Sequence, residues 1–188
     1  MTTALILIDV QESIRHRPYW NPAEVPVFLE RSNALLRGAL AAGIPVVRIL
    51  HSDGPQTADN PWSPASGHVR PFDGLAPFTA AAEFLKHRHS ALVGTGLEVW
   101  LHQQGIRRLI VAGFRTEQCC ETTARHASDA GWEVDFVTEA TLTFAIRHSS
   151  GVELSPADIK LRTEAVLHDR FASLCTVEQA LTRAQSMS

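Results

Sequence analysis

Short apolar runs alternate with amphipathic stretches along the whole chain. The apolar runs predict β-strands, and they lie at 3–8, 44–50, 83–86, 107–113, 132–138 and 171–175. The run "TALILI" at 3–8 is continuously apolar, which is typical of a strand buried on both faces of a parallel sheet. Helical patterns lie between the strands, at 22–43, 94–105, 117–130, 155–169 and after 176. This alternation predicts one domain over 1–188, a three-layer α/β/α Rossmann-like fold with a mostly parallel six-stranded sheet.

Capping residues and side-chain periodicity sharpen the predicted helices. Ser155 and Asp158, with Pro156 between them, predict a capping box with proline in the first turn, and Thr176 and Gln179 predict another capping box. The helix at 22–43 is expected to bury an apolar side made of Val27, Leu35, Leu36 and Leu40. The segments 51–78 and 139–154 are polar or rich in turn residues, so we expect long connections there.

Polar residues follow several of the predicted strands. Asp9 follows the first run, the sequence His51-Ser52-Asp53 follows the second, and Lys86 ends the third. The turn 113–120 follows the fourth run. Because sites in such sheets lie at the carboxyl ends of the strands, we expect these groups to meet at one edge.

The segment "GFRTEQCCETTARHA", 113–127, contains two of the chain's three cysteines, Cys119 and Cys120. Thr116 is a candidate N-cap, which would place Cys119 in the first helical turn. Free N–H groups and the helix dipole there favour a thiolate nucleophile and can bind an oxyanion. The alternative is a small apolar residue that packs at a helix start, and we interpret Cys120 in that way.

Asp9 and Lys86 complete a plausible reaction centre with Cys119. Asp9 would take the thiol proton, and Lys86 would keep Asp9 ionised while Cys119 attacks a carbonyl to form a thioester. Two plainer interpretations stay open: Asp9 as a cap or turn residue, and Lys86 as a solvated surface lysine. Lys86 is one of only two lysines among 17 basic residues, and no histidine is singled out by spacing for a histidine-based triad.

Composition narrows the possible partners. The 188 residues are 45% hydrophobic and carry a formal net charge of −3, without a basic stripe, so we expect no nucleic-acid partner. The apolar runs are far shorter than the ~20 residues of a membrane span, and the N-terminal run is too short for a signal peptide. Three cysteines make no disulfide framework. We therefore expect a cytoplasmic protein that does not bind membranes.

Three segments resemble the isochorismatase-like cysteine hydrolases, the superfamily that includes nicotinamidases and N-carbamoylsarcosine amidohydrolase. They are "ALILIDVQESI", "FLKHRHSALVGTGLEVWL" and "RRLIVAGFRTEQCCETTARHASDAGWEVDFVTEAT", in the family's order. The resemblance implies a catalytic triad of Asp9, Lys86 and Cys119, with Cys120 where the family has a small apolar residue. It also implies a cis peptide bond before Arg115, an oxyanion hole made by the backbone N–H groups of Arg115 and Cys119, and a homodimer or homotetramer.

The segment "LHSDG" departs from the metal motif Asp-x-His of nicotinamidases. His51, Asp53 and His68 do not have the family's ligand spacing, so we expect neither a metal nor another cofactor. The side chain of Arg115, where the family has a small residue, would reach a substrate carboxylate or point to the surface. The substrate pocket is expected to include Gln11, His51, Trp62, Arg70, Phe72 and Phe144.

The resulting prediction is a metal-independent cysteine hydrolase that cleaves a C–N bond of a small amide or carbamoyl compound through a thioester. One alternative is vinyl-ether hydrolysis of the isochorismatase type, with Asp9 as the proton donor. The other is a thiol redox or binding protein without hydrolase activity, although adjacent cysteines make a strained disulfide.

Overall fold

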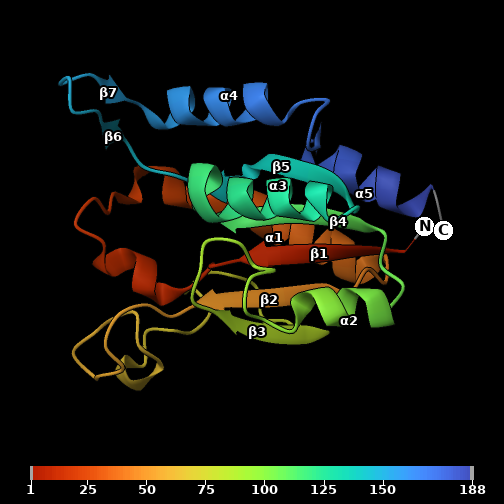
Figure 1. The fold of residues 1–188 in the computed structure, drawn as a ribbon, viewed down its shortest axis with the longest axis horizontal. Coiled ribbons are helices and arrows are strands. Elements are labelled where there is room, and N and C mark those ends of the chain that lie inside the picture. The colour runs from red at the N-terminus through yellow and green to blue at the C-terminus, as the bar shows by residue number, and fades with distance from the viewer. Residues whose placement is uncertain (1, 187–188) are drawn as a thin grey trace.

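A six-stranded parallel sheet forms the centre of the computed structural model, which describes residues 2–186 (Figure 1). The strand order is β3-β2-β1-β4-β5-β8, and every pairing in this sheet is parallel. The strands are β1 Thr3–Ile8, β2 Val46–His51, β3 Ala82–Lys86, β4 Arg108–Phe114, β5 Glu133–Leu142 and β8 Ser173–Leu174. A separate antiparallel pair is formed by β6 Ile146–Arg147 and β7 Glu153–Leu154. The fold class predicted from the sequence is confirmed.

Helices cover both faces of the sheet and give the three layers. The helices are α1 Val25–Ala41, α2 Leu97–Gln103, α3 Glu121–Asp129, α4 Pro156–Leu167 and α5 Val177–Gln185. The apolar sides of α1 and α5 pack on one face with Leu5 and Leu7, whereas α2, α3 and the end of α4 pack on the other with Ile6 and Ile8. Because side chains alternate across a strand, the wholly apolar β1 contributes to both cores.

The first predicted helix differs from the observed one in two respects. A short 3₁₀ turn at Pro22–Glu24 precedes α1, and Val27 and Leu40 are exposed, so their assignment to the buried side was wrong. Leu35 and Leu36 are buried as expected. The observed buried side follows helical spacing from a different start, through Val25, Phe28, Ser32, Leu35, Leu36 and Ala39.

Strand β5 extends into the segment that was predicted to be a polar connection. It continues to Leu142 through a register shift, with Val111 paired to Phe136 and Gly113 paired to Thr141. The polar residue Thr141 in this extension is buried and pairs with Gly113 of β4, which alternating hydrophobicity does not reveal. The hairpin of β6 and β7 occupies the rest of the segment. Both predicted capping boxes, at Ser155 and Thr176, are confirmed.

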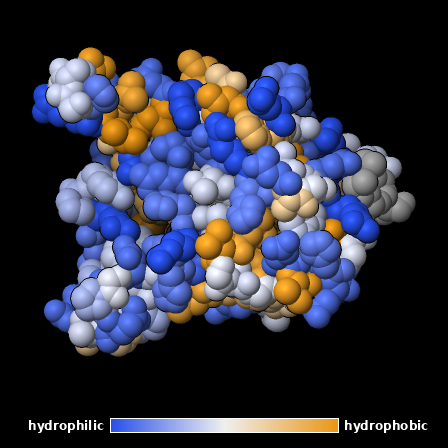
Figure 2. All heavy atoms as spheres, viewed as in Figure 1, coloured by the Kyte–Doolittle hydropathy of each residue, from blue (hydrophilic) through white to orange (hydrophobic). Residues whose placement is uncertain are grey.

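Three short helical turns lie in the segments that follow β1, β2 and β4. They are η1 Glu12–His16, η3 Pro64–Ser66 and the π-helical turn η4 Thr116–Cys120. The face seen in Figure 2 is mostly polar, and its hydrophobic residues form several separate patches. None of the helices within residues 2–186 is long and apolar enough to cross a membrane.

Candidate active site

The carboxyl ends of β1, β3 and β4 bring three predicted residues together at one edge of the sheet. The Nζ atom of Lys86 lies 2.8 Å from Oδ2 of Asp9 and 3.3 Å from Sγ of Cys119. The side chain of Lys86 is 0% exposed, so the interpretation as a solvated surface lysine was wrong. Burying an ammonium removes its hydration, and this cost must be offset by nearby acceptors. The carboxylate and the sulfur are such acceptors here.

Close approach of β1 and β4 positions this group. Gly113 pairs with Ile8, and a Cβ atom at position 113 would lie 2.0 Å from the carbonyl oxygen of Ile8. Gly113 also has φ +128°, a conformation that glycine tolerates and other residues rarely adopt. The residue after Ile8, Asp9, turns out of the strand with φ +52°, and its N–H donates to the carbonyl oxygen of Ile49. Glycine at 113 thus allows Asp9 to lie beside the turn that carries Cys119.

His51 is the third hydrogen-bond partner of the Lys86 ammonium. Its Nδ1 lies 3.0 Å from Nζ, and its backbone is held by both ends of the Gln11 amide, with distances of 2.9 Å and 2.7 Å. Burial, with the charge of Lys86 next in importance, lowers the pKa of His51 to about 3. The imidazole is therefore neutral near pH 7 and accepts the bond. Sequence reasoning placed His51 in the pocket but missed this contact. The contact could have been expected from the ends of the adjacent strands β2 and β3, where His51 pairs with Lys86.

The environment of Cys119 differs from the one expected from the sequence. Thr116 does not cap the helix, since its hydroxyl donates to Thr141 Oγ1 at 2.8 Å, and Cys119 lies in a π-helical turn before α3. Burial, followed by the charge of Asp9, raises the pKa of Cys119 to about 12, although Lys86 opposes the shift. This shift favours the protonated thiol near pH 7, which is opposite to the effect expected from free N–H groups and a helix dipole. Cys120 is completely buried in the core, which agrees with its interpretation as packing.

Asp9 is a proton acceptor that interacts with this thiol. Burial raises the pKa of its carboxyl group, and the charge of Lys86 acts in the opposite direction. Oδ2 contacts Lys86, whereas Oδ1 is buried and has no hydrogen-bond partner among the described residues. This oxygen is available to a proton or to a bound molecule.

Arg115 does not point to the surface. The peptide bond between Phe114 and Arg115 is cis, as the resemblance implied. The guanidinium forms an ion pair with Glu117 and donates to the carbonyl oxygen of Phe144 at 3.1 Å, and it lies 4.6 Å from the ring centroid of Tyr19. The buried side chain thus holds the turn before Cys119 against the segment that follows β5.

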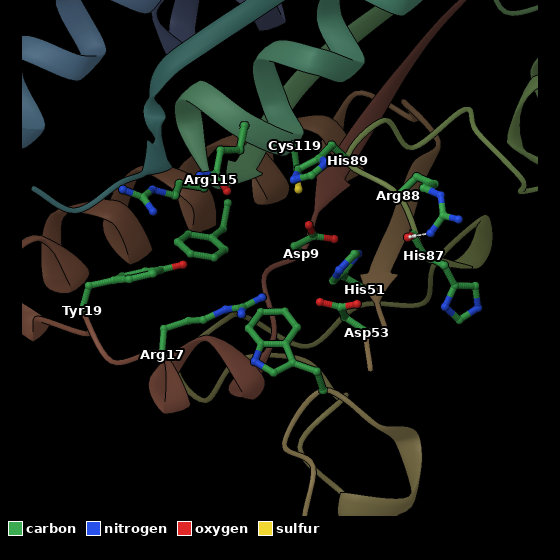
Figure 3. Close-up of a pocket in the computed structure, with 13 residues that line it drawn as sticks. Asp9, Arg17, Tyr19, His51, Asp53, His87, Arg88, His89, Arg115 and Cys119 are labelled. Carbon is green, nitrogen blue, oxygen red and sulfur yellow. Dashed lines mark hydrogen bonds between the residues drawn. The ribbon is translucent and has the colours of Figure 1, made fainter. Parts of the chain in front are cut away.

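A cavity of about 240 Å³ opens above these groups (Figure 3). Its walls contain Asp9, Arg17, Tyr19, His51, Asp53, Trp62, His87, Arg88, His89, Phe114, Arg115, Gln118 and Cys119. Of the pocket residues expected from the sequence, His51 and Trp62 lie in the lining. Sequence reasoning missed Arg17 and Tyr19, although they follow the same strand as Asp9 and so belong to the same edge of the sheet.

Four expected pocket residues lie outside the cavity lining, and each has a physical reason. Both ends of the Gln11 amide are hydrogen-bonded to the backbone of His51. Arg70 is exposed and pairs with Asp73 at 2.6 Å. Phe72 and Phe144 are buried in the apolar core, where both rings contact Trp20.

Of the residues considered as metal ligands, His51 and Asp53 line the cavity together, whereas His68 lies elsewhere. His51 contacts Lys86, and the ring of His68 packs against His16 at a tilt of 49°, with ring centroids 4.2 Å apart. Among residues 2–186, no three side chains of histidine, cysteine, aspartate or glutamate come together in a way that could hold a metal ion.

Known proteins are similar to this chain in sequence and in fold. A family model described as the isochorismatase domain matches residues 3–177. The uncharacterized isochorismatase family protein YrdC of Bacillus subtilis (strain 168) is 28% identical over 181 residues, which cover 95% of this chain and 94% of that protein. Streptothricin hydrolase of Streptomyces noursei is 29% identical over 143 residues, covering 76% of this chain and 50% of that protein. A crystal structure of a candidate hydrolase of the isochorismatase family from Chromobacterium violaceum ATCC 12472 has a TM-score of 0.87 and 26% identity, covering 100% of this chain and 95% of that chain.

Proposed function

The chain belongs to the isochorismatase family and is a hydrolase, and from that premise we propose that it cleaves the C–N bond of a small amide or carbamoyl compound with Cys119 as the nucleophile. The observation that carries the proposal is the position of Cys119 Sγ, 3.3 Å from the Lys86 ammonium in the wall of the cavity. A cysteine that served only as packing would not need a buried ammonium and carboxylate beside it.

In the proposed reaction, proton transfer accompanies attack. The resting thiol is neutral, so Asp9 takes its proton as Sγ bonds to the carbonyl carbon. Lys86 stays charged and stabilises the developing negative charge on sulfur. The carbonyl oxygen becomes an oxyanion, which the backbone N–H groups of Arg115 and Cys119 bind.

The second half of the reaction returns the site to its starting state. The C–N bond breaks as Asp9 gives its proton to the departing nitrogen, which leaves as ammonia or an amine and a thioester on Cys119. Asp9 then takes a proton from water, the hydroxyl adds to the thioester, and the acid product leaves as the proton returns to sulfur. The proton that leaves on the nitrogen comes from the thiol, the proton that returns to sulfur comes from water, and Asp9 carries both.

The proposal is tested with a panel of small primary amides and carbamoyl compounds, by measuring the ammonia released. We expect Cys119→Ala to lower the rate by roughly 10³-fold or more, because the covalent route is lost. Cys175→Ser, which changes a half-buried cysteine that is not in the cavity lining, is the matched control and should retain the wild-type rate. Acid quenching during turnover should trap an acyl group on the peptide that contains Cys119, detected by mass spectrometry.

Different results would support the alternative chemistry. If Cys119→Ala keeps its activity while Asp9→Asn loses it on a vinyl-ether substrate, the nucleophile assignment is wrong. Asp9 would then act as a proton donor, a role that the raised pKa of its carboxyl group would favour.

A further inference from the structure

Arg17 brings into the wall of the active-site cavity a cation that has no carboxylate partner among residues 2–186. It follows η1, where its N–H donates to the carbonyl oxygen of Ile14 at 3.2 Å, and its side chain extends into the cavity (Figure 3). The guanidinium carbon lies 3.8 Å from the ring centroid of Trp62, so the side chain is stacked on the indole. Its Nε is buried and has no hydrogen-bond partner among the described residues.

The other charges of the lining are mostly compensated within the protein. Asp9 is paired with Lys86, and Arg115 is paired with Glu117. The carboxylate of Asp53 accepts the N–H of Gly54 at 2.9 Å, and it is exposed at the cavity rim. Arg88, also exposed, donates to the carbonyl oxygen of its neighbour His87. Arg17 is therefore the cation of the lining that has a buried donor and neither a hydrogen-bond acceptor nor a carboxylate for its side chain in the described part of the chain.

The charge of Arg17 acts on His51, which contacts the Lys86 ammonium. Burial is the largest cause of the low pKa of His51, and the positive charges of Lys86 and Arg17 lower it further. Arg17 and Cys119 also line the same cavity. A ligand that fills this cavity and is bound by Arg17 would therefore present another of its atoms to Cys119.

We propose that Arg17 binds a carboxylate of the substrate, and that the enzyme acts on small amides or carbamoyl compounds that also carry a carboxylate. This inference rests on the proposed function. Stacking on Trp62 occupies the face of the guanidinium and leaves its in-plane N–H groups free, which is the geometry that binds a carboxylate through two parallel hydrogen bonds. The cavity of about 240 Å³ is below the usual size of drug-binding pockets, so only a short acid would fit.

The test compares unbranched amides that end in a carboxylate with alkyl amides of the same length that end in a methyl group. We expect the wild-type enzyme to prefer the acids. Arg17→Met should lower kcat/KM for the acids by roughly tenfold to a hundredfold, the loss expected for hydrogen bonds to a charged group, and should change the neutral amides by less than about threefold. For Arg17→Lys we expect an intermediate kcat/KM for the acids, because lysine keeps the positive charge but lacks the two parallel N–H donors of the guanidinium.

Arg15→Met is the matched control. Arg15 also stacks on an aromatic ring, with its guanidinium 4.3 Å from the centroid of Phe72, but it is paired with Glu12 and is not in the cavity lining. We expect this variant to keep the preference for acids. Thermal unfolding of both variants separates lost binding from lost structure.

Binding is measured separately from turnover, so that a failure of the amide chemistry can be distinguished from a failure of the carboxylate site. Calorimetry with Cys119→Ala should detect the acids, and binding should weaken when Arg17→Met is added. Binding without turnover in the wild type would contradict the proposed reaction and leave the carboxylate site supported. The inference about Arg17 is overturned if Arg17→Met affects acids and neutral amides equally, or if no acid binds.

Discussion

Lys86 has three N–H donors, and the structure gives each of them an acceptor. The acceptors are Asp9 Oδ2, Cys119 Sγ and His51 Nδ1, at 2.8, 3.3 and 3.0 Å. An ammonium is a compact charge that can serve three acceptors arranged around one point, whereas an arginine fork is planar and needs acceptors in its own plane. The arrangement explains why a chain that otherwise favours arginine has a lysine at this strand end.

At the residue scale, the state of the Cys119 thiol leads to a prediction about alkylation. Because burial and Asp9 raise its pKa to about 12, we expect iodoacetamide to modify Cys119 slowly near neutral pH in the free enzyme. The rate should rise about tenfold per pH unit, since only the thiolate reacts, and should reach no plateau below about pH 10. Asp9→Asn removes a charge that raises the pKa, so it should react faster at the same pH.

Tandem mass spectrometry assigns the modified cysteine and thereby distinguishes Cys119 from Cys120. Urea-denatured protein provides the reference rate, because its thiols regain their ordinary pKa. A plateau near pH 7 in the folded enzyme would show a resting thiolate, and proton transfer to Asp9 during attack would then be unnecessary.

At the element scale, the contact between β1 and β4 gives the second prediction. Gly113→Ala would drive a Cβ atom into the backbone of Ile8 and require an unfavourable φ, so we expect a loss of roughly 3 kcal/mol or more in the free energy of unfolding. Gly105→Ala is the control, because φ there is also positive, at +64°, but the added Cβ meets open space. It should cost about 1 kcal/mol. Urea unfolding curves measure both, and equal losses would show that close approach of the strands is not the constraint.

The sequence predicted well those elements whose signals are local. Continuous apolar runs located the central strands, and Ser155 and Thr176 marked the starts of α4 and α5. It failed where a distant partner decides the structure. Thr116 would be a good cap by itself, but Thr141, 25 positions away, takes its hydroxyl. The extension of β5 likewise depends on pairing with β4 and not on its own hydrophobic pattern.

At the scale of the whole molecule, the sheet edge was predictable and the cavity was not. Parallel topology brings the ends of β1, β3 and β4 together regardless of the loops, which is why Asp9, Lys86 and Cys119 could be expected to meet. The cavity walls depend on how the connections after β1 and β2 fold over that edge, and this is how Arg17 comes to stack on Trp62. The expected homodimer or homotetramer and the cytoplasmic location stay predictions.

The third prediction concerns stability in acid. The folded state holds His51 neutral with a pKa of about 3, whereas an unfolded histidine titrates near 6.5, so the unfolded state binds more protons between these values. Stability should therefore fall as the pH drops from about 6.5 towards 3, by at most about 1.4 kcal/mol per pH unit from this residue. His51→Gln should make the decline shallower.

Urea unfolding at several pH values between 4 and 7 (roughly the window in which the two states differ in bound protons) measures this slope. His168→Gln removes an imidazole that is more than half exposed and provides the comparison. If His51→Gln and His168→Gln change the slope equally, the buried imidazole is not the source of the acid sensitivity.

The two hydrogen bonds between the Gln11 side chain and the backbone of His51 restrict which residue can occupy position 11. One end of the amide accepts the N–H of His51 while the other donates to its carbonyl oxygen. Glutamate has nearly the same shape, but an ionised carboxylate would turn a lone pair towards that carbonyl and repel it. The side chain at position 11 must therefore offer one acceptor and one donor, and its volume alone does not decide which residue fits. Deamidation of Gln11 would remove the donor and weaken the hydrogen bonds that hold His51, the third acceptor of Lys86.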